Sequence, residues 1–309
     1  MEIRSLRPDE FQTYLALFRR CFTSTLTDTQ LRQKIFPIPL DVSPLTVVAV
    51  SSGVFVGSLS LYPLPCRCHG ERLWAGQHGD AMVAPEARKQ GLFKKMIAEI
   101  EGLAAPHGFD FLLTFPSTRN LGSHQAFRST GYQSMEIQRH IRIQLKSAAL
   151  FPRILRRCSR SLYRSWEKTT AGALNLEECI PLLQEDGTET ATLEYSQDFF
   201  QYKSLFLHSF RSIEGVPCLI GHDLFEIKVG PPKLDSTTAE RLVPQLRALG
   251  RRFAKDTLTF IAGQSDLESL RLDKDCYSVG EFDVMIKPIS ESGRMVTRLS
   301  LPFFAYDTF

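Results

Sequence analysis

The segment 84–93, APEARKQGLF, combines basic side chains with one glycine directly before an apolar helical run. A predicted strand ends at Val83, and a predicted helix begins at about Gly91. The first amides of a helix have no intrahelical partner, and the helix dipole adds roughly half a positive charge at that end. Gly91 lets an oxygen approach the backbone, and Arg88 and Lys89 add side-chain charge. The segment therefore predicts a phosphate-binding loop, although its spacing is neither that of a Walker loop nor that of a Rossmann fingerprint.

Two titratable side chains, His78 and Asp80, lie on the predicted strand just before this loop. An unperturbed histidine has a pKa of about 6.5, and both residue types can accept a proton in general base catalysis. Gly76 and Gly79 interrupt the alternation of this strand, which predicts a bulge or the close approach of another backbone. For each titratable residue, the alternative to a chemical role is a capping or pairing interaction with a neighbour.

Hydrophobic periodicity places these residues in a chain that alternates strands and helices. In the first half the sequence predicts strands over 1–7, 45–50, 54–62, 73–84, 109–115 and 132–145, and helices over 9–22, 28–35, 92–108 and 118–130. In the second half it predicts strands over 224–231, 256–263 and 280–288, and helices over 236–253 and 265–272. The second set repeats the order of elements found over 79–145, which predicts an internal duplication.

The loop and the segment after it resemble a known family. VAPEARKQGLFKKM resembles motif A of the GCN5-related N-acetyltransferases, the GNAT superfamily, whose pattern is Arg/Gln-x-x-Gly-x-Gly/Ala. Arg88 and Gly91 match this pattern, whereas Phe93 stands where the family has a small residue. NLGSHQAFRSTGY resembles motif B, with Asn120 at its start and Gly131 near its end. The resemblance covers roughly the first half of the chain.

This resemblance implies an α/β (α+β) GNAT fold, in which a mixed, mostly antiparallel central sheet is flanked by helices. It also implies an acyl-coenzyme A, such as acetyl-CoA, as acyl donor. The pyrophosphate would lie against the loop amides, and the pantetheine arm would lie where the fourth strand splays from its neighbour. The cofactor-binding positions that it implies are Met82, Val83, Arg88, Lys89, Gln90, Gly91, Leu92, Phe93, Asn120 and Ser123.

The resemblance also assigns the chemistry of acyl transfer from a thioester to an amine. It makes His78 and Asp80 equal candidates for the general base on the fourth strand, and it makes the amide of Ala81 or Met82 the oxyanion donor.

The general acid is less clearly assigned. The family's usual tyrosine acid is missing, because its position holds Phe127. His124 and Tyr132 are the candidate substitutes, and for Tyr132 a packed ring is the favoured alternative.

The length of 309 residues predicts two domains. We expect a GNAT domain over 1–145, a basic connector over 146–175, and a degenerate GNAT-like domain over 176–309 that lacks the cofactor loop. The basic stretch 139–168 fits a connector helix, an anionic lipid surface or an acidic partner protein. The tail 299–309 resembles that of two-copy GNAT proteins, where it lies close to the pocket; the alternative is a strand that completes the sheet.

Composition narrows the class of protein. The chain is 43% hydrophobic and 23% charged, its net charge is +3, and its longest apolar runs have the length of strands. These values predict a cytoplasmic protein without a transmembrane segment and disfavour nucleic acid as a partner. The seven scattered cysteines predict reduced thiols. The Cys66-x-Cys68-His69 cluster fits a turn at a strand edge better than a zinc corner, so we expect no metal.

The leading hypothesis is an acyl-CoA-dependent N-acyltransferase that acts on a small-molecule amine, such as an amino sugar or a natural-product intermediate. A second hypothesis uses a thioester on an acyl carrier protein, or decarboxylates a malonyl thioester. A third takes aminoacyl-tRNA as the donor. The hypothesis from another class is a non-catalytic acyl-CoA-binding protein, which the residues Phe93 and Phe127 suggest.

Overall fold

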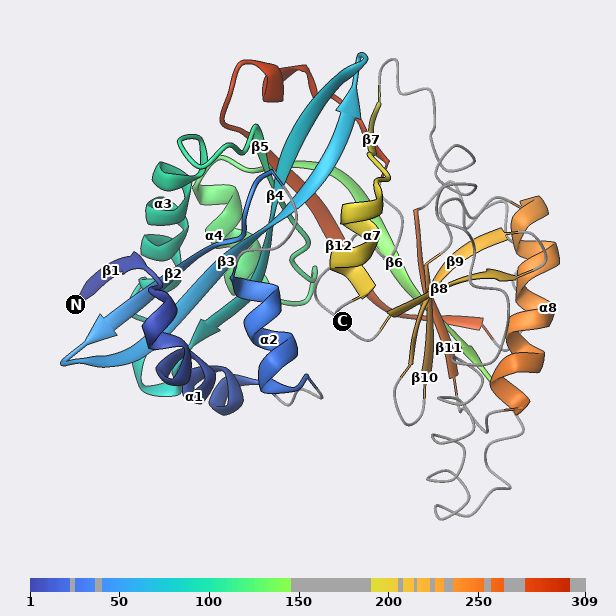
Figure 1. Cartoon of the computed structure of the whole chain (residues 1–309), viewed down its shortest axis with the longest axis horizontal. Helices are drawn as coiled ribbons and strands as arrows, with labels where there is room; N and C mark the ends of the chain where they lie inside the picture. Colours follow the sequence, from blue (N-terminus) through green and yellow to red (C-terminus); the bar gives the residue numbers. More distant parts are fainter. Residues whose placement is uncertain are drawn as a thin grey trace, which may run out of the picture.

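The computed structural model describes residues 1–22, 26–36, 41–145, 190–204, 208–213, 216–222, 226–230, 236–252, 257–263 and 276–300. Most of their strands form one mixed sheet in the order β1-β2-β3-β4-β5-β12-β6-β11-β10-β9-β8. Figure 1 shows this sheet running from one half of the molecule to the other, with helices packed against it. Most neighbouring strands are antiparallel, and β4–β5 and β10–β11 are parallel, as the predicted fold class requires.

The elements of the first half match the predicted ones closely. They are β1 (Glu2–Ser5), α1 (Phe11–Cys21), α2 (Asp28–Ile35), β2 (Leu45–Ser51), β3 (Val54–Cys68), β4 (Glu71–Val83), α3 (Leu92–Ala104), β5 (Phe111–Thr114), α4 (Leu121–Ser129) and β6 (Gln133–Gln144). The strand β3 is longer than predicted, because it continues to Cys68 and pairs with β4 down to the turn at His69 and Gly70.

Helices α1 and α3 pack on opposite faces of β3. Side chains alternate along a strand, so neighbouring residues of β3 face different helices. A Cβ at Gly57 would lie 3.1 Å from the Met96 sulfur, so this face of β3 lies against α3. Ser58, Ser60 and Tyr62 occupy the alternate positions, on the face that α1 covers. On this second face, the hydroxyl of Tyr62 bonds Asp80.

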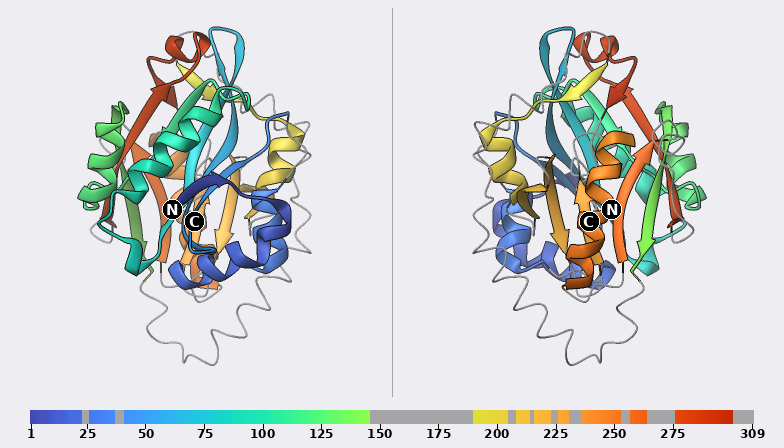
Figure 2. Two further views of the ribbon diagram at one scale, coloured as in Figure 1. Left: turned by 90° about the vertical axis from the view of Figure 1, so that its left-hand side faces the viewer. Right: turned by 90° about the vertical axis from the view of Figure 1, so that its right-hand side faces the viewer.

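The second half supplies the remaining strands and one long helix. They are β7 (Ala191–Leu193), α7 (Gln197–Ser204), β8 (His208–Ile213), β9 (Val216–His222), β10 (Glu226–Gly230), α8 (Ser236–Arg252), β11 (Thr257–Gly263), β12 (Cys276–Pro288) and β13 (Leu299–Ser300). The order β10-α8-β11 repeats β4-α3-β5, and both strand pairs are parallel. Figure 2 shows α8 against the strands of the second half.

The two halves exchange their last strands. β5 pairs with β12 of the second half, whereas β6 of the first half pairs with β11 and lies beside β12. The strand that follows α4 therefore does not pair with β5, because β12 lies between them. The predicted domain boundaries stay a prediction. The connector 146–175, the helix 265–272 and residues 301–309 lie outside the described residues.

No helix among the described residues is long and apolar enough to cross a membrane. Those residues also include no group of three or more histidine, cysteine or acidic side chains placed to hold a metal ion. Cys66 and Cys68 are buried in the core, and His69 lies in the hairpin turn with φ of 49°.

Candidate active site

The strands β4 and β5 separate at the end that precedes the phosphate-binding loop. They pair in parallel from Ala75 to Gln77, and beyond Gln77 no strand among the described residues pairs with β4 on that side. The Ala84 amide donates to the Val56 carbonyl at 2.9 Å, so alternation turns the Val83 amide away from β3 and toward the gap. The same alternation directs the Met82 amide toward β3. A gap that exposes a strand edge can bind an extended chain with amide groups.

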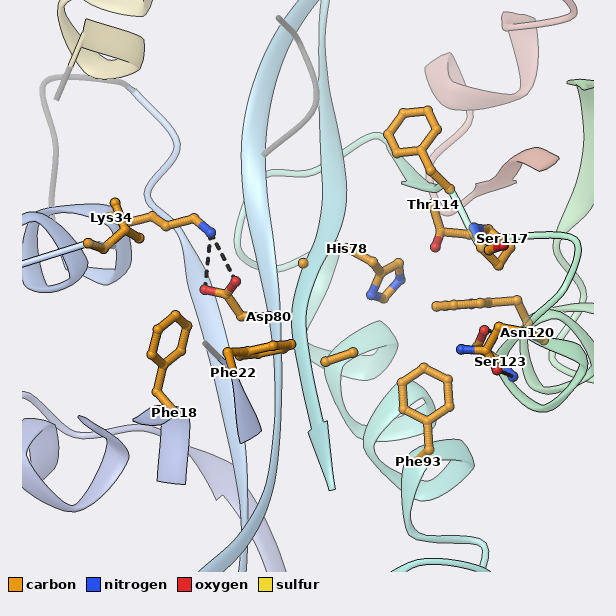
Figure 3. Close-up of a pocket in the computed structure, with 16 residues that line it drawn as sticks. Phe18, Phe22, Lys34, His78, Asp80, Phe93, Thr114, Ser117, Asn120 and Ser123 are labelled. Carbon is orange, nitrogen blue, oxygen red and sulfur yellow. Dashed lines mark hydrogen bonds and ion pairs between the residues drawn. The ribbon is translucent and has the colours of Figure 1, made fainter. Parts of the chain in front are cut away.

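A β-bulge in β4 determines where the two titratable side chains point. The register between β3 and β4 shifts after Gly79, and Asp80 has φ of 47° in the left-handed region. Side chains two residues apart on a regular strand share a face, but the bulge sends Asp80 to the opposite face from His78. Asp80 contacts Tyr62, whereas the ring of His78 lies against Phe127. Figure 3 shows the two side chains pointing apart.

The loop after β4 presents the start of α3 to solvent. A short 3-10 turn over Pro85–Ala87 leads to Lys89 and Gly91, which have left-handed φ values of 61° and 71°. Gly91 is the N-cap of α3, and it has no side chain to bond the first-turn amides. Arg88 Nε donates to the Val83 carbonyl at 3.1 Å, which ties the loop to the strand end. This end of α3 keeps amide donors and positive charge available to an anion.

Phe93, which departs from motif A, packs against Phe127, which departs from motif B. Their ring centroids are 5.4 Å apart with nearly perpendicular planes. Phe127 also contacts the rings of His78 and Tyr132, at 5.1 and 5.0 Å. The ring of Phe93 therefore turns onto α4, and the two departures from the family pattern form one contact.

A cavity of about 400 Å³ lies beside the bulge. Figure 3 shows Phe18, Phe22 and Lys34 on one side of β4, with Phe93, Asn120 and Ser123 on the other. Its lining residues come from both faces of β4 and from the segment after β5: Phe18, Phe22, Leu26, Lys34, His78, Gly79, Asp80, Ala81, Phe93, Thr114, Phe115, Pro116, Ser117, Asn120, Ser123 and Phe127.

Asp80 is the carboxylate on this wall. Lys34 Nζ lies 3.0 and 3.1 Å from its two oxygens, and the Tyr62 hydroxyl donates to Oδ2. The ammonium of Lys34 also lies 4.4 Å from the centre of the Tyr62 ring. Burial raises the pKa values of Tyr62 and the neighbouring Tyr14 well above 10, and the Asp80 charge raises them further. Both hydroxyls therefore stay protonated, and Lys34 and Tyr62 hold the carboxylate from two directions.

His78 is buried and neutral. Burial, together with the smaller effect of the positive charge of Lys287, lowers its pKa to about 3. Its Nε2 lies 2.6 Å from the Tyr132 hydroxyl, and its Nδ1 has no hydrogen-bond partner among the described residues. Lys287 in turn bonds Glu101 at 2.7 Å. His78 is therefore a weak proton acceptor at neutral pH.

The segment that follows β5 is held by the second half of the chain. The Thr118 amide donates to the Glu281 carbonyl at 3.0 Å, and the Asp283 amide donates to the Pro116 carbonyl at 3.0 Å. The buried carboxylate of Asp283 accepts from His124 Nε2 at 2.7 Å and from the Ser134 hydroxyl. The strand β12 therefore supports one wall of the cavity.

The structure brings five of the predicted site residues together at the cavity: His78, Asp80, Phe93, Asn120 and Ser123. Asn120 also caps α4 by accepting from the Ser123 amide at 3.3 Å. Met82 and Leu92 are buried, and Val83, Arg88, Lys89, Gln90 and Gly91 lie along the gap and the loop.

The two candidate acids do not line the cavity. His124 bonds Asp283, and Tyr132 bonds His78. Sequence reasoning missed Lys34, Phe18 and Phe22. For Lys34, the one indication in the sequence is its position on α2: the helical spacing places it on the same face as the apolar residues that are buried.

Comparisons with known proteins agree with this geometry. Residues 2–133 match the family model of the acetyltransferase (GNAT) domain. Comparison with curated proteins gave no match. Among solved structures, the chain is similar to a GCN5-related N-acetyltransferase from Kribbella flavida, with a TM-score of 0.60 and 11% identity over 96% of this chain and 74% of that one.

Two further solved structures cover nearly the whole chain. Eis1 from Mycobacterium abscessus has a TM-score of 0.56 and 14% identity over 96% of this chain and 76% of that one. A tandem GNAT protein from the clavulanic acid biosynthesis pathway has a TM-score of 0.59 and 11% identity over 94% of this chain and 98% of that one. At these identities the likeness concerns the fold, and it extends over both halves.

Proposed function

Because residues 2–133 belong to the GNAT superfamily of acetyltransferases, we propose that the protein transfers an acyl group from acyl-coenzyme A to the amine of a small molecule. The observation that carries this proposal is the separation of β4 from β5, directly beside the exposed start of α3 and the cavity that holds Asp80. The start of α3 suits a nucleotide pyrophosphate, the gap between β4 and β5 suits a pantetheine amide, and the cavity suits an amine.

The residues along the gap fit the donor. The amides at the start of α3 and the side chains of Arg88 and Lys89 would hold the pyrophosphate. The Val83 backbone and the polar end of α4 at Asn120 would hold the pantetheine arm. Acyl-coenzyme A supplies the activated thioester when it is bound. The ring of Phe93 packs on Phe127, and both rings line the cavity.

Asp80 is the better candidate for the proton acceptor. Its carboxyl group lines the cavity, whereas His78 is neutral with a pKa of about 3 and already bonds Tyr132. The donors Lys34 and Tyr62 fix the position of this carboxylate, which lines the cavity. His78 would then serve to anchor Tyr132 and the ring cluster around Phe127.

Donor binding is tested with two variants that add the same charge to α3; Gly91 has φ of 71°, so Gly91→Glu also strains the backbone there. Gly91→Glu places a negative charge at the start of α3, and Gly102→Glu places the same charge about 16 Å along that exposed helix face. We expect titration calorimetry with acetyl-CoA to show binding to the wild type and to Gly102→Glu, and at least 10-fold weaker binding to Gly91→Glu. Equal affinity in all three proteins would place the donor elsewhere.

The chemical step is tested with Asp80→Asn. General base catalysis is worth roughly 100-fold or more, so kcat should fall by about that factor while acetyl-CoA affinity is kept. His78→Gln is the comparison, and it should lose much less. Binding of acetyl-CoA without turnover of any amine would instead favour the non-catalytic reading, and salt-sensitive binding of tRNA would favour an aminoacyl-tRNA donor.

A further inference from the structure

The acceptor end of the cavity already contains a balanced pair of charges. Lys34 Nζ lies 3.0 Å from Asp80 Oδ1, and their side chains are only 6% and 11% exposed. Both residues line the cavity. The rest of its lining, among the residues that the structure describes, is uncharged, because burial keeps His78 neutral. This end of the site therefore has a net charge of zero before any acceptor enters.

Charge balance restricts which acceptors can bind there. A simple ammonium that approaches Asp80 also approaches Lys34, and it brings a second cation to a single anion. Two like charges about 4 Å apart repel by about 4 kcal/mol at an effective dielectric constant of about 20. An acceptor that carries an ammonium and a carboxylate adds no net charge, and its carboxylate offsets the charge of Lys34.

The uncharged wall beside this pair is apolar and largely aromatic. Phe18 and Phe22 come from the end of α1, with ring centroids 5.2 Å apart, and Leu26 follows them. Phe22 remains 38% exposed, although it lies at the cavity. Figure 3 shows these rings on the same side of β4 as Lys34 and Asp80. An acceptor whose carbon skeleton covers Phe18 and Phe22 would gain hydrophobic burial.

We infer that the acceptor is a zwitterionic α-amino acid with an aromatic or branched aliphatic side chain. Asp80 binds its ammonium, Lys34 binds its carboxylate, and Phe18 and Phe22 contact its side chain. The inference rests on the proposed acyl transfer and names its acceptor class. In the reaction the amine nitrogen bonds to the acyl carbon as the carbon–sulfur bond breaks. Of the two protons that leave nitrogen, one passes through Asp80 to solvent and the other ends on the departing sulfur.

The decisive experiment compares matched acceptors on the wild-type enzyme, with acetyl-CoA as donor and thiol release as the readout. L-Phenylalanine is compared with phenethylamine and with phenylalaninamide, and L-leucine with isoamylamine. Glucosamine represents amino sugars, and aniline represents neutral aromatic amines. We expect kcat/KM to be at least 10-fold higher for each amino acid than for its amine or amide. A higher value for phenethylamine, glucosamine or aniline would overturn the inference.

The variant Lys34→Met sharpens the test, because it leaves the site with a net charge of −1. Phenethylamine should then become the better acceptor, so that the ratio of kcat/KM for phenylalanine over phenethylamine falls below one. Lys95→Met removes the same charge from an exposed position outside the cavity lining and should leave this ratio unchanged. An unchanged ratio in Lys34→Met would refute the role of Lys34. If Lys34→Met does not fold, the wild-type acceptor panel still decides.

The proposed transferase function and the proposed acceptor class can be refuted separately. If acetyl-CoA neither raises the melting temperature nor supports thiol release with any amine, the proposed transferase function is wrong. If acetyl-CoA binds and amines are acylated regardless of a carboxylate, the function stands and only the acceptor class is wrong.

Discussion

The buried, neutral state of His78 makes a quantitative prediction about stability in mild acid. The pKa of His78 falls from about 6.5 in the unfolded chain to about 3 in the folded protein, because burial removes the imidazolium from water. Between these two values the unfolded chain binds the proton and the folded protein does not. The free energy of unfolding must therefore fall as the pH decreases from about 6.5 toward 3. At pH 5 the contribution is RT ln(1 + 10^1.5), about 2 kcal/mol.

The assay is urea unfolding of the wild type and of His78→Gln at pH 7 and at pH 5. Glutamine keeps a polar side chain but cannot take up a proton, so the difference between the two proteins isolates His78. Glu10, whose pKa is lowered to about 2 mainly by its hydrogen bond to Arg4, loses its contribution only below about pH 4.5 and does not interfere. We expect the wild type to lose about 2 kcal/mol more than the variant.

Equal losses in the two proteins would refute the reasoning, since they would mean that His78 can be protonated in the folded state. The same experiment bears on catalysis. A histidine with a pKa of about 3 gives no inflection near pH 6.5 in kcat/KM, so any such inflection in the wild type should persist in His78→Gln.

Three further predictions follow from packing. A Cβ at Gly79 would lie 2.6 Å from the buried Tyr62 ring, so Gly79→Ala should cost about 1–3 kcal/mol in urea unfolding and displace the hydroxyl that holds Asp80. Asp283→Ala leaves His124 without its partner and should cost about 1–3 kcal/mol, whereas Asp283→Asn, which keeps an acceptor, should cost less in the same measurement. A chain that ends at residue 145 lacks β12 beside β5, so its circular dichroism should show no cooperative melting, in contrast to the full chain.

The sequence predicted the local elements because each depends on nearby residues, and the phosphate-binding role of the loop before α3 stays a prediction. The apolar spacing of Phe11, Tyr14, Leu15 and Phe18 determines the buried face of α1, and all four are buried. The loop before α3 was recognisable because a strand end, a basic cluster and a glycine follow one another. In the structure Gly91 has a left-handed φ of 71°, which glycine adopts without steric cost.

The arrangement of the catalytic candidates was not predictable in the same way. Gly76 and Gly79 indicated an irregular strand, but the left-handed conformation occurs at Asp80, which carries a side chain. The left-handed conformation of Asp80 places its side chain on the opposite face of β4 from that of His78. No local sequence pattern predicts this conformation. Lys34 was equally inaccessible to sequence reasoning, because its partner lies 46 residues away and the contact depends on how α2 packs against β4.

The exchange of β6 and β12 joins the second half of the chain to the elements that carry the candidate site. In a simple duplication each half would complete its own sheet, and a half without a cofactor could be lost. Here β12 completes the first half instead, where Asp283 holds His124 on α4 and Lys287 holds Glu101 on α3. These two helices carry Asn120 and the phosphate-binding loop. If the protein binds acetyl-CoA as we propose, substitutions on β12 should affect its affinity, measured by titration calorimetry, although none of the β12 residues lines the cavity.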